Sequence, residues 1–524
     1  MNSEMKPTEL ENLLADHSLG TIVEAARAIV QRAESLADDD SSEEPADTLE
    51  PTDYTDVGQA GVFAREYGDR VRYSRATDFI VYDGAVWRES GIRAQGLAQA
   101  LTERQLEEAR GRVRAAQEAN NAAAESEDAE QIQAAKAAVK REEKFRDFVL
   151  SRRKSDRIRA TLTEARPALE IDVAELDKDG HLLNTPGGTV DLRTGVVFPH
   201  RPDNFCTKIT GVSPSTEGAE LWQDFLQRLT CGDRDLQRYL QECAGMFCVG
   251  QVLKECLVIA YGTGGNGKST FYGVQARVLG DYSGALSSDV LTAGCRRNVQ
   301  PELAELRGKR FVVAAELEQG QRLDTSMVKR LCSTDTVTAE RKYRDPFLFR
   351  PTHSAVLFTN HLPKISADDA GTWARLVVVP FAASFRGEKG EIKNYTEYLY
   401  QRCGGAVLQW MIDGARAFLS NGGEIEPPEC VRAAIEAYKT ESDWLTEFLT
   451  AECELGRYQQ PSGELYACYR DFCDRSGEYQ RSGKTFKEAL AAKGFEAKKI
   501  RSGIVIVGLR IIPAAVEADE IELL

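Results

Sequence analysis

The sequence lacks a long apolar run and a secretory leader. No stretch reaches the roughly 18 consecutive apolar residues that a membrane-spanning helix needs. Residues 1–20 are polar and acidic, without the basic start and apolar stretch of a secretory signal. We therefore expect a cytoplasmic protein that does not enter a membrane.

Metal-binding clusters are also missing from the sequence. The chain has twelve cysteines but no Cys-x-x-Cys pair, and its five histidines are scattered. The pairs Cys243/Cys248 and Cys468/Cys473 do not have a zinc-ligand spacing. This pattern indicates reduced, mostly buried thiols in a reducing compartment.

Basic residues are in deficit, since the net charge is −16. Such a charge excludes a protein that coats nucleic acid over its whole surface, although it allows a basic channel inside an acidic shell. The hydrophobic content of 42% is enough for real cores, and 524 residues predict two or three domains.

What the chain does have is a phosphate-binding loop of the form G-x-x-x-x-G-K-[ST]. The apolar strand 257–260 precedes it, and a helix is expected over 270–279. Glycines let backbone N–H groups turn inward around a phosphate, and the helix offers its positive N-terminus. Lys268 can reach the β- and γ-phosphates, and Ser269 can ligate Mg²⁺. The residues expected to bind ATP are Gly262, Thr263, Gly264, Gly265, Asn266, Gly267, Lys268, Ser269 and Thr270.

Polar side chains follow two further apolar strands. Glu316 comes directly after strand 311–315, where a P-loop fold holds Mg²⁺, and Glu318 is a candidate for activating the attacking water. Asn360 follows the strand 355–358 and can sense the γ-phosphate. Each of the three can also be read as an ordinary polar residue in a turn.

Arg375 precedes another apolar strand, 376–380. An arginine in this position can stabilise transition-state charge on the ATP of a neighbouring subunit. Taken alone, it reads as an ordinary surface arginine.

The order of these motifs resembles that of the superfamily 3 helicases, a compact AAA+ group. A Lys-x5-Asp-x5-Arg stretch, which is Lys329, Asp335 and Arg341 here, lies between the Glu-x-Glu strand and the Asn strand. Within the group, the chain is similar to the phage/plasmid primase–helicase family, which is related to the poxvirus helicase-primase. The similarity extends to a Tyr-Asp-Gly-x-x-Trp hairpin at 82–87 and covers roughly residues 58–512.

The resemblance implies an α/β protein in which an AAA+ P-loop motor follows a mixed α+β N-terminal domain and precedes a C-terminal winged-helix domain. The expected divisions are an acidic flexible tail (1–57), the N-terminal α+β domain with a long helical insertion (58–215), a helical collar (216–250), the motor (251–425), the winged helix (426–512) and a second acidic tail (513–524).

Two departures from the family pattern stand out. Relatives have Gly-Gly-Asp where this chain has Ser333-Thr334-Asp335, which can alter the local turn. Residues 1–57 are too few for the primase domain with which many relatives begin. We therefore expect the helicase half alone, with priming supplied by a separate protein.

DNA contacts are expected at a hairpin that points into the pore of similar helicases. Two basic residues flank Tyr343 near its expected tip, and such a group can grip a phosphate backbone and stack on a base. The alternative is an exposed charged turn. The expected DNA-binding residues are Lys329, Arg341, Lys342 and Arg344.

The function implied by the resemblance is a replicative DNA helicase of a phage, prophage or plasmid in a bacterial host. A hexameric ring, as in such relatives, would use ATP and Mg²⁺ to translocate 3′ to 5′ on single-stranded DNA and open forked duplexes. Lys268, Ser269 and Glu316 would bind ATP from one side, and Arg375 would reach in from the next subunit.

Two other functions stay open. One is an origin-binding initiator in which ATP switches assembly and the winged helix reads sequence. The other is a small-molecule P-loop kinase, against which the winged helix speaks. The winged helix could bind DNA or dock a protein through its basic cluster, which comprises Lys484, Lys487, Lys493, Lys498, Lys499 and Arg501.

Overall fold

The computed structural model describes residues 48–125, 127–295, 298–340, 346–365, 370–385, 392–476 and 479–512. Most of the predicted N-terminal tail, the predicted C-terminal tail and three predicted DNA-binding residues (Arg341, Lys342 and Arg344) lie outside these ranges. The chain divides into two compact units. One joins the residues up to Glu66 with Gln95–Ala165, and the other joins Tyr67–Ala94 with Arg166–Leu524.

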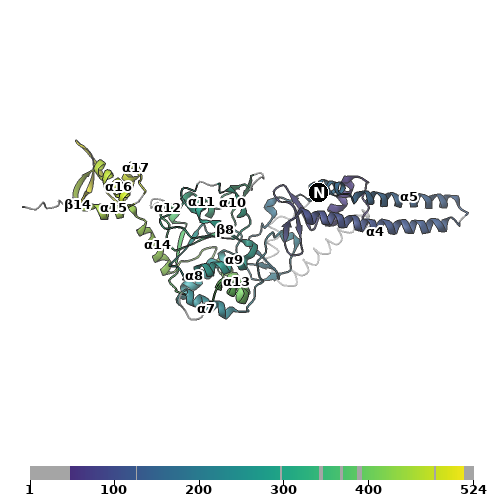
Figure 1. Ribbon diagram of the computed structural model, residues 1–524, viewed down its shortest axis with the longest axis horizontal. Helices are drawn as coiled ribbons and strands as arrows, with labels where there is room; N and C mark the ends of the chain where they lie inside the picture. Colours follow the sequence, from purple (N-terminus) through teal and green to yellow (C-terminus); the bar gives the residue numbers. More distant parts are fainter. Residues whose placement is uncertain are drawn as a thin grey trace, which may run out of the picture. The chain divides into compact units, whose positions relative to one another are not determined.

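The first unit is helical, as the Ala-, Glu-, Gln-, Arg- and Lys-rich composition of residues 95–165 predicts. Its helices are α3 (Asp56–Tyr67), α4 (Gly91–Ala123), α5 (Ala129–Arg152) and α6 (Ser155–Leu169), and the ends of three of them extend into the second unit. α4 and α5 run side by side as a long hairpin (Figure 1). The Asp128 side chain begins α5 by accepting the backbone N–H groups of Glu130 and Gln131. Phe145 and Phe148 form a small core with residues of α4.

The second unit begins with two small antiparallel sheets. Their strands are β1 (Val71–Ser74), β2 (Asp78–Tyr82) and β3 (Trp87–Glu89), and then β4 (Leu182–Thr185), β5 (Gly188–Asp191) and β6 (Val197–Phe198). The buried Trp87 side chain donates its indole N–H to the Pro202 carbonyl at 2.9 Å. The predicted hairpin at 82–87 is therefore the β2–β3 turn of a three-stranded sheet. Short 3₁₀ turns are η1 (Val173–Glu175) and η2 (Pro202–Asn204).

The centre of this unit is a parallel five-stranded sheet in the order β13-β7-β12-β9-β8. Its strands are β7 (Leu257–Tyr261), β8 (Ser283–Ser287), β9 (Phe311–Ala315), β12 (Ser354–Thr359) and β13 (Leu376–Pro380). Because β12 lies between β7 and β9, the residue after β12 stands between the loop after β7 and the acid after β9.

Both faces of the sheet are buried, so β7, β9, β12 and β13 read as largely continuous apolar runs, whereas the edge strand β8 does not. Val258 and Ala260 face one core, formed with α7 (Ala219–Leu229), α8 (Arg234–Met246), α9 (Lys268–Leu279) and α13 (Tyr395–Ser420). Leu257 and Ile259 face the other core, formed with α10 (Gln300–Glu305), α11 (Thr325–Cys332) and Tyr438 of α14 (Glu429–Glu441). The remaining elements of this region are η3 (Gly280–Tyr282), η4 (Ser288–Leu291), α12 (Ala370–Trp373), and the antiparallel strands β10 (Val337–Ala339) and β11 (Phe347–Phe349).

Two glycines set the approach of α8 to α13. A Cβ atom on Gly245 would lie 2.1 Å from the backbone nitrogen of Ala415, and one on Gly414 would lie 2.1 Å from the carbonyl oxygen of Gln241. The backbones can therefore meet only because both positions lack a side chain. This crossing anchors the predicted collar helices to the long helix that follows the sheet.

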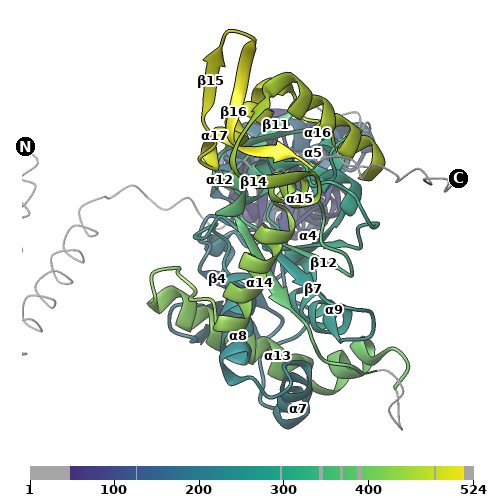
Figure 2. The same cartoon turned by 90° about the vertical axis from the view of Figure 1, so that its left-hand side faces the viewer.

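The C-terminal segment contains three helices and an antiparallel sheet in the order β14-β16-β15 (Figure 2). The elements are α15 (Trp444–Glu452), β14 (Cys453–Pro461), α16 (Ser462–Ser476), α17 (Gly483–Ala492), β15 (Ala497–Ile500) and β16 (Gly503–Ile511). The helical pattern of residues 431–455 predicts one helix there, and this prediction was wrong. Asp443 caps a new helix by accepting the Thr446 N–H, and Cys453 begins a strand that pairs with β16.

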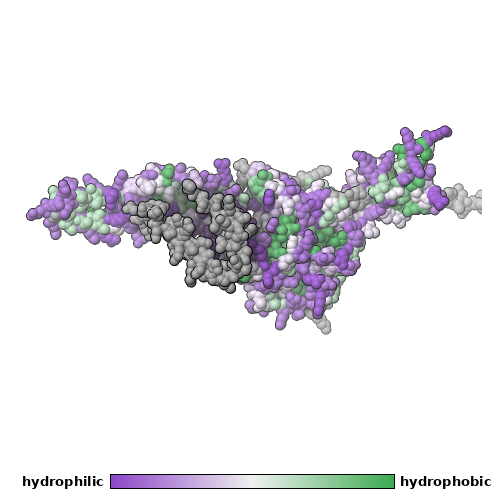
Figure 3. Space-filling view, turned by 180° about the vertical axis from the view of Figure 1, so that it is seen from behind, coloured by the Kyte–Doolittle hydropathy of each residue, from purple (hydrophilic) through white to green (hydrophobic). Residues whose placement is uncertain are grey.

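The surface is largely hydrophilic. Figure 3 shows hydrophilic side chains over most of one face, interrupted by smaller apolar patches. Among the described residues, no helix combines the length and the apolar character needed to cross a lipid bilayer.

Candidate nucleotide-binding site

The phosphate-binding loop joins the end of β7 to the start of α9. Gly265 and Gly267 adopt left-handed backbone conformations, with φ of 86° and 84°. Gly267 is the residue that caps α9, so the N-terminal N–H groups of this helix open toward the loop. A Cβ on Gly267 would lie 2.8 Å from Leu229 and 2.9 Å from Phe385. Both conformation and space therefore require glycine in this position.

Lys268 is the first residue of α9, and its side chain turns back over the loop. Its ammonium group donates to the Gly262 carbonyl at 2.5 Å, to Asn266 Oδ1 at 3.0 Å and to Asn360 Oδ1 at 3.2 Å. The residue is only 4% exposed. Burial lowers the pKa of Lys268, and the negative charge of Glu316 partly opposes this shift. A buried ammonium held only by neutral oxygens is suited to receive an anionic phosphate.

Glu316 and Asn360 lie at the same edge of the sheet as Lys268. The Glu316 backbone is in the left-handed region, with φ of 46°, and its N–H donates to the Phe358 carbonyl at 3.0 Å. The carboxylate is exposed, as is Ser269 in the first turn of α9. Hydroxyl and carboxylate oxygens are the ligands that Mg²⁺ prefers, so these residues fit the predicted metal role.

A segment that the sequence did not single out closes over the loop. The Asn266 side-chain amide donates to the Phe381 carbonyl at 3.0 Å, and the Phe385 N–H donates to the Gly265 carbonyl at 2.9 Å. The chain leaving β13 thus holds the loop in shape. The two phenylalanines carried no sequence signal, because their contribution here is made by backbone groups.

Arg375 is far from this edge. Its carbonyl accepts the N–H of Leu257, the first residue of β7, whereas the loop begins after the last residue of that strand. Its guanidinium forms an ion pair with Glu255 and donates to the Gly371 carbonyl at 2.9 Å. Glu255 in turn accepts the Thr334 N–H at 3.3 Å. The structure therefore separates Arg375 from Lys268 and adds a partner, Glu255, which no sequence motif indicates.

The other predicted site residues lie outside the group formed by Lys268, Glu316 and Asn360. Glu318 is exposed in the turn after β9, where its backbone N–H donates to Gln321 Oε1 at 3.2 Å. Lys329 is half-buried in the last turn of α11. In the C-terminal basic cluster, Lys493 forms an ion pair with Asp443 at 2.5 Å.

The parallel sheet and the glycine-rich loop at its carboxyl edge define a P-loop α/β domain. The chain also matches two family models. The D5 N terminal like family matches residues 60–231, and a family of unknown function, DUF5906, matches residues 260–375.

Curated relatives are viral. The chain is 29% identical to "Putative helicase L207/L206" of Acanthamoeba polyphaga mimivirus, over 40% of this chain and 22% of that protein. It is 27% identical to "Putative primase C962R" of African swine fever virus (strain Badajoz 1971 Vero-adapted), over 61% of this chain and 35% of that protein. The chain thus spans about a fifth to a third of these relatives. Among solved structures, the C-terminal region of NrS-1 aligns with a TM-score of 0.38 and 13% identity, over 57% of this chain and 76% of that one.

The two family models and the viral relatives confirm the resemblance to the superfamily 3 primase–helicases. The matched segments lie before and within the P-loop domain.

Proposed function

We propose that this protein is an ATP-driven replicative DNA helicase whose AAA+ motor works as a ring, with a winged helix formed by the C-terminal segment. The relatives named as helicases support the reaction class. The observation that carries the proposal is the division of the site between two edges of one sheet. Lys268, Glu316 and Asn360 lie at the carboxyl edge, and Arg375 lies at the amino edge.

The separation is too large for one subunit to bridge. Five strand residues separate Arg375 from the start of the loop, which corresponds to roughly 17 Å along β13 and β7. The guanidinium is also turned away from the loop, toward Glu255. Arg375 can therefore act on ATP only from a neighbouring subunit, as a head-to-tail ring would allow.

Each residue at the carboxyl edge has a distinct task in this proposal. The loop N–H groups and Lys268 bind the phosphates of ATP, and Asn360 orients the attacking water beside the γ-phosphate. Ser269 and Glu316 would hold Mg²⁺, which supplies charge neutralisation on the phosphate oxygens. Glu318 is the proposed group for water activation, and Lys329 and the hairpin residues Arg341, Lys342 and Arg344 are the proposed DNA contacts.

The direct experiment is displacement of one strand from a forked duplex in the presence of ATP and Mg²⁺. We expect the wild-type protein to displace the strand, with a 3′ to 5′ preference, and Lys268→Ala to lose both ATP hydrolysis and displacement. Equal behaviour of the two proteins would refute the proposal. An ATP-dependent footprint at one sequence without displacement would instead favour the origin-binding initiator.

A further inference from the structure

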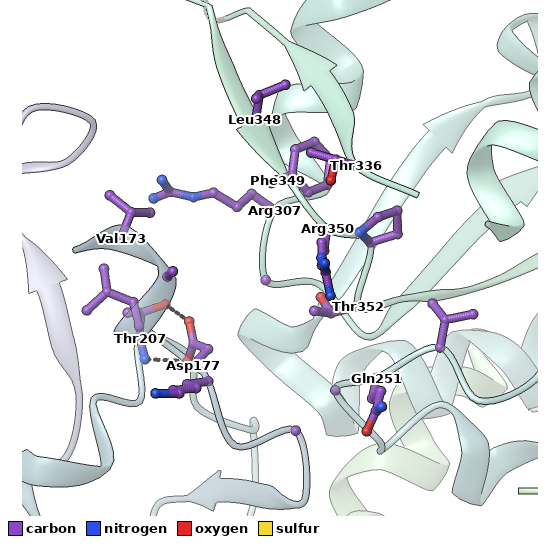
Figure 4. Close-up of a pocket in the computed structure, with 18 of the residues that line it drawn as sticks. Val173, Asp177, Thr207, Gln251, Arg307, Thr336, Leu348, Phe349, Arg350 and Thr352 are labelled. Carbon is purple, nitrogen blue, oxygen red and sulfur yellow. Dashed lines mark hydrogen bonds between the residues drawn. The ribbon is translucent and has the colours of Figure 1, made fainter. Parts of the chain in front are cut away.

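A cavity of about 780 Å³ lies at the amino edge of the second unit's sheet, whereas the phosphate-binding loop lies at the carboxyl edge. The lining of the cavity includes residues that come shortly before β7, β9 and β12. Figure 4 shows Val173, Asp177 and Thr207 along one wall. Arg307, Phe349 and Arg350 lie across from them on the other wall. Leu348 is 68% exposed and Arg350 is also exposed, so the cavity opens to solvent.

Two cations of this cavity have no anionic partner. Within the described residues, neither Lys208 nor Arg350 forms an ion pair; Lys208 only donates to the Thr207 hydroxyl at 3.3 Å. Lys208 also lies close enough to Lys309 to help lower the pKa of that residue, an effect second to burial. Asp281 and Glu305 oppose this effect at Lys309, whereas Lys208 itself forms no ion pair within the described residues. An unpaired cation in a cavity favours the binding of an anion.

The acidic residues of the cavity are already engaged by the protein. Asp177 accepts the Thr207 N–H at 2.7 Å and also the Thr207 hydroxyl, and Asp172 accepts the Ala174 N–H at 2.9 Å. Their hydrogen bonds fix the two turns on which they stand. They therefore shape the wall and, within the described residues, form no ion pair with Lys208 or Arg350.

The cavity lies at the base of the β10–β11 hairpin. Thr336 precedes β10, Leu348 and Phe349 belong to β11, and all three line the cavity. A single strand of DNA that ran along this hairpin would reach the cavity at the base of the hairpin. The lining suits a polymer backbone, since it combines cations with apolar side chains.

The same wall connects to Arg375. Thr334 lines the cavity, and its N–H donates to Glu255, the carboxylate that holds the Arg375 guanidinium. A ligand that shifts Thr334 would thus alter the hold on the residue assigned to the neighbouring ATP.

We propose that this cavity binds the phosphate backbone of single-stranded DNA, with Lys208 and Arg350 each contacting a phosphate. The inference rests on the proposed helicase function and names a second DNA contact region besides the hairpin tip. Neutralised phosphates release counterions, so each contact contributes to the salt dependence of binding.

The test measures the affinity of the full chain for a dye-labelled oligothymidylate as a function of salt concentration. We expect Lys208→Ala/Arg350→Ala to lower the slope of log K against log salt by about 1.4, since each contact to a single strand contributes about 0.7. The charge-preserving Lys208→Arg/Arg350→Lys should keep the slope. A matched control is Arg432→Ala/Lys439→Ala, which removes two positive charges that are already paired with Glu429 and Glu436.

Three outcomes decide the matter. The proposal is supported if the slope is reduced in the cavity variant but unchanged in the control and in the charge-preserving variant, with the same thermal unfolding in all variants. Equal slopes in the cavity and control variants overturn it, while the helicase function stands if the wild type still displaces strands. A wild-type protein that binds no single strand overturns both.

Discussion

Asn360→Ala is the substitution that most sharply separates ATP binding from hydrolysis. In the structure, Asn360 Oδ1 accepts from the Lys268 ammonium at 3.2 Å, and the residue follows β12, between the loop strand and the Glu316 strand. In the proposed site, its side-chain amide would therefore stand beside the γ-phosphate before ATP arrives. A donor fixed in advance costs no reorganisation during the reaction.

The expected magnitude follows from comparable groups. Loss of one such fixed donor lowers kcat by about 10² to 10³, or roughly 3–4 kcal/mol. ATP binding should weaken by less than about tenfold, or 1.4 kcal/mol, because the loop N–H groups and Lys268 remain. Lys268 would also keep its other acceptors, Gly262 and Asn266.

The assay compares ATP turnover at saturation with the Kd of a fluorescent ATP analogue. Asn360→Asp is the informative companion, because its carboxylate would pair with Lys268 and should weaken binding as well as turnover. A kcat for Asn360→Ala within about threefold of wild type, well below the expected loss of a fixed donor, would refute this reasoning.

Three further predictions concern other parts of the molecule. Burial lowers the pKa of His353 from 6.5 to about 4, so the unfolded chain binds a proton that the native protein lacks. The contribution of the neutral imidazole to the free energy of unfolding is then complete above pH 6.5, and it falls by about 3 kcal/mol as the pH drops to 4. In urea unfolding, His353→Phe should lack this part of the pH dependence. Gly245→Ala should destabilise by about 1–3 kcal/mol through the 2.1 Å contact with Ala415, whereas Gly111→Ala, where the Cβ meets nothing, should not. Glu255→Gln should lower kcat about fivefold with KM unchanged, because the ion pair that positions Arg375 is half-buried and the loop is at the other edge.

Much of the carboxyl edge could be predicted from the sequence. The loop pattern fixes a strand, a turn and a helix locally, and parallel strands bring their carboxyl ends to one edge. Lys268, Glu316 and Asn360 could therefore be placed together once their strands were recognised. That Asn360 lies between the other two depends on the insertion of β12, which no local pattern encodes.

Other features could not be predicted because distant parts of the chain decide them. Glu255 is 120 residues from Arg375 in sequence and stands in a polar turn without periodicity. β14 follows a helix directly and has little β-branched content, and only its pairing with β16 makes it a strand. The cavity likewise joins Lys208 to Arg350, from segments with no shared motif.

In the proposed ring, one subunit supplies Lys268 and the next supplies Arg375. Mixing Lys268→Ala protein with Arg375→Ala protein and measuring ATP hydrolysis stimulated by single-stranded DNA tests this arrangement most directly. Each variant alone should be inactive. In a random equal mixture about a quarter of the interfaces combine an intact loop with an intact arginine, so activity should reappear. A mixture as inactive as its components would contradict the account.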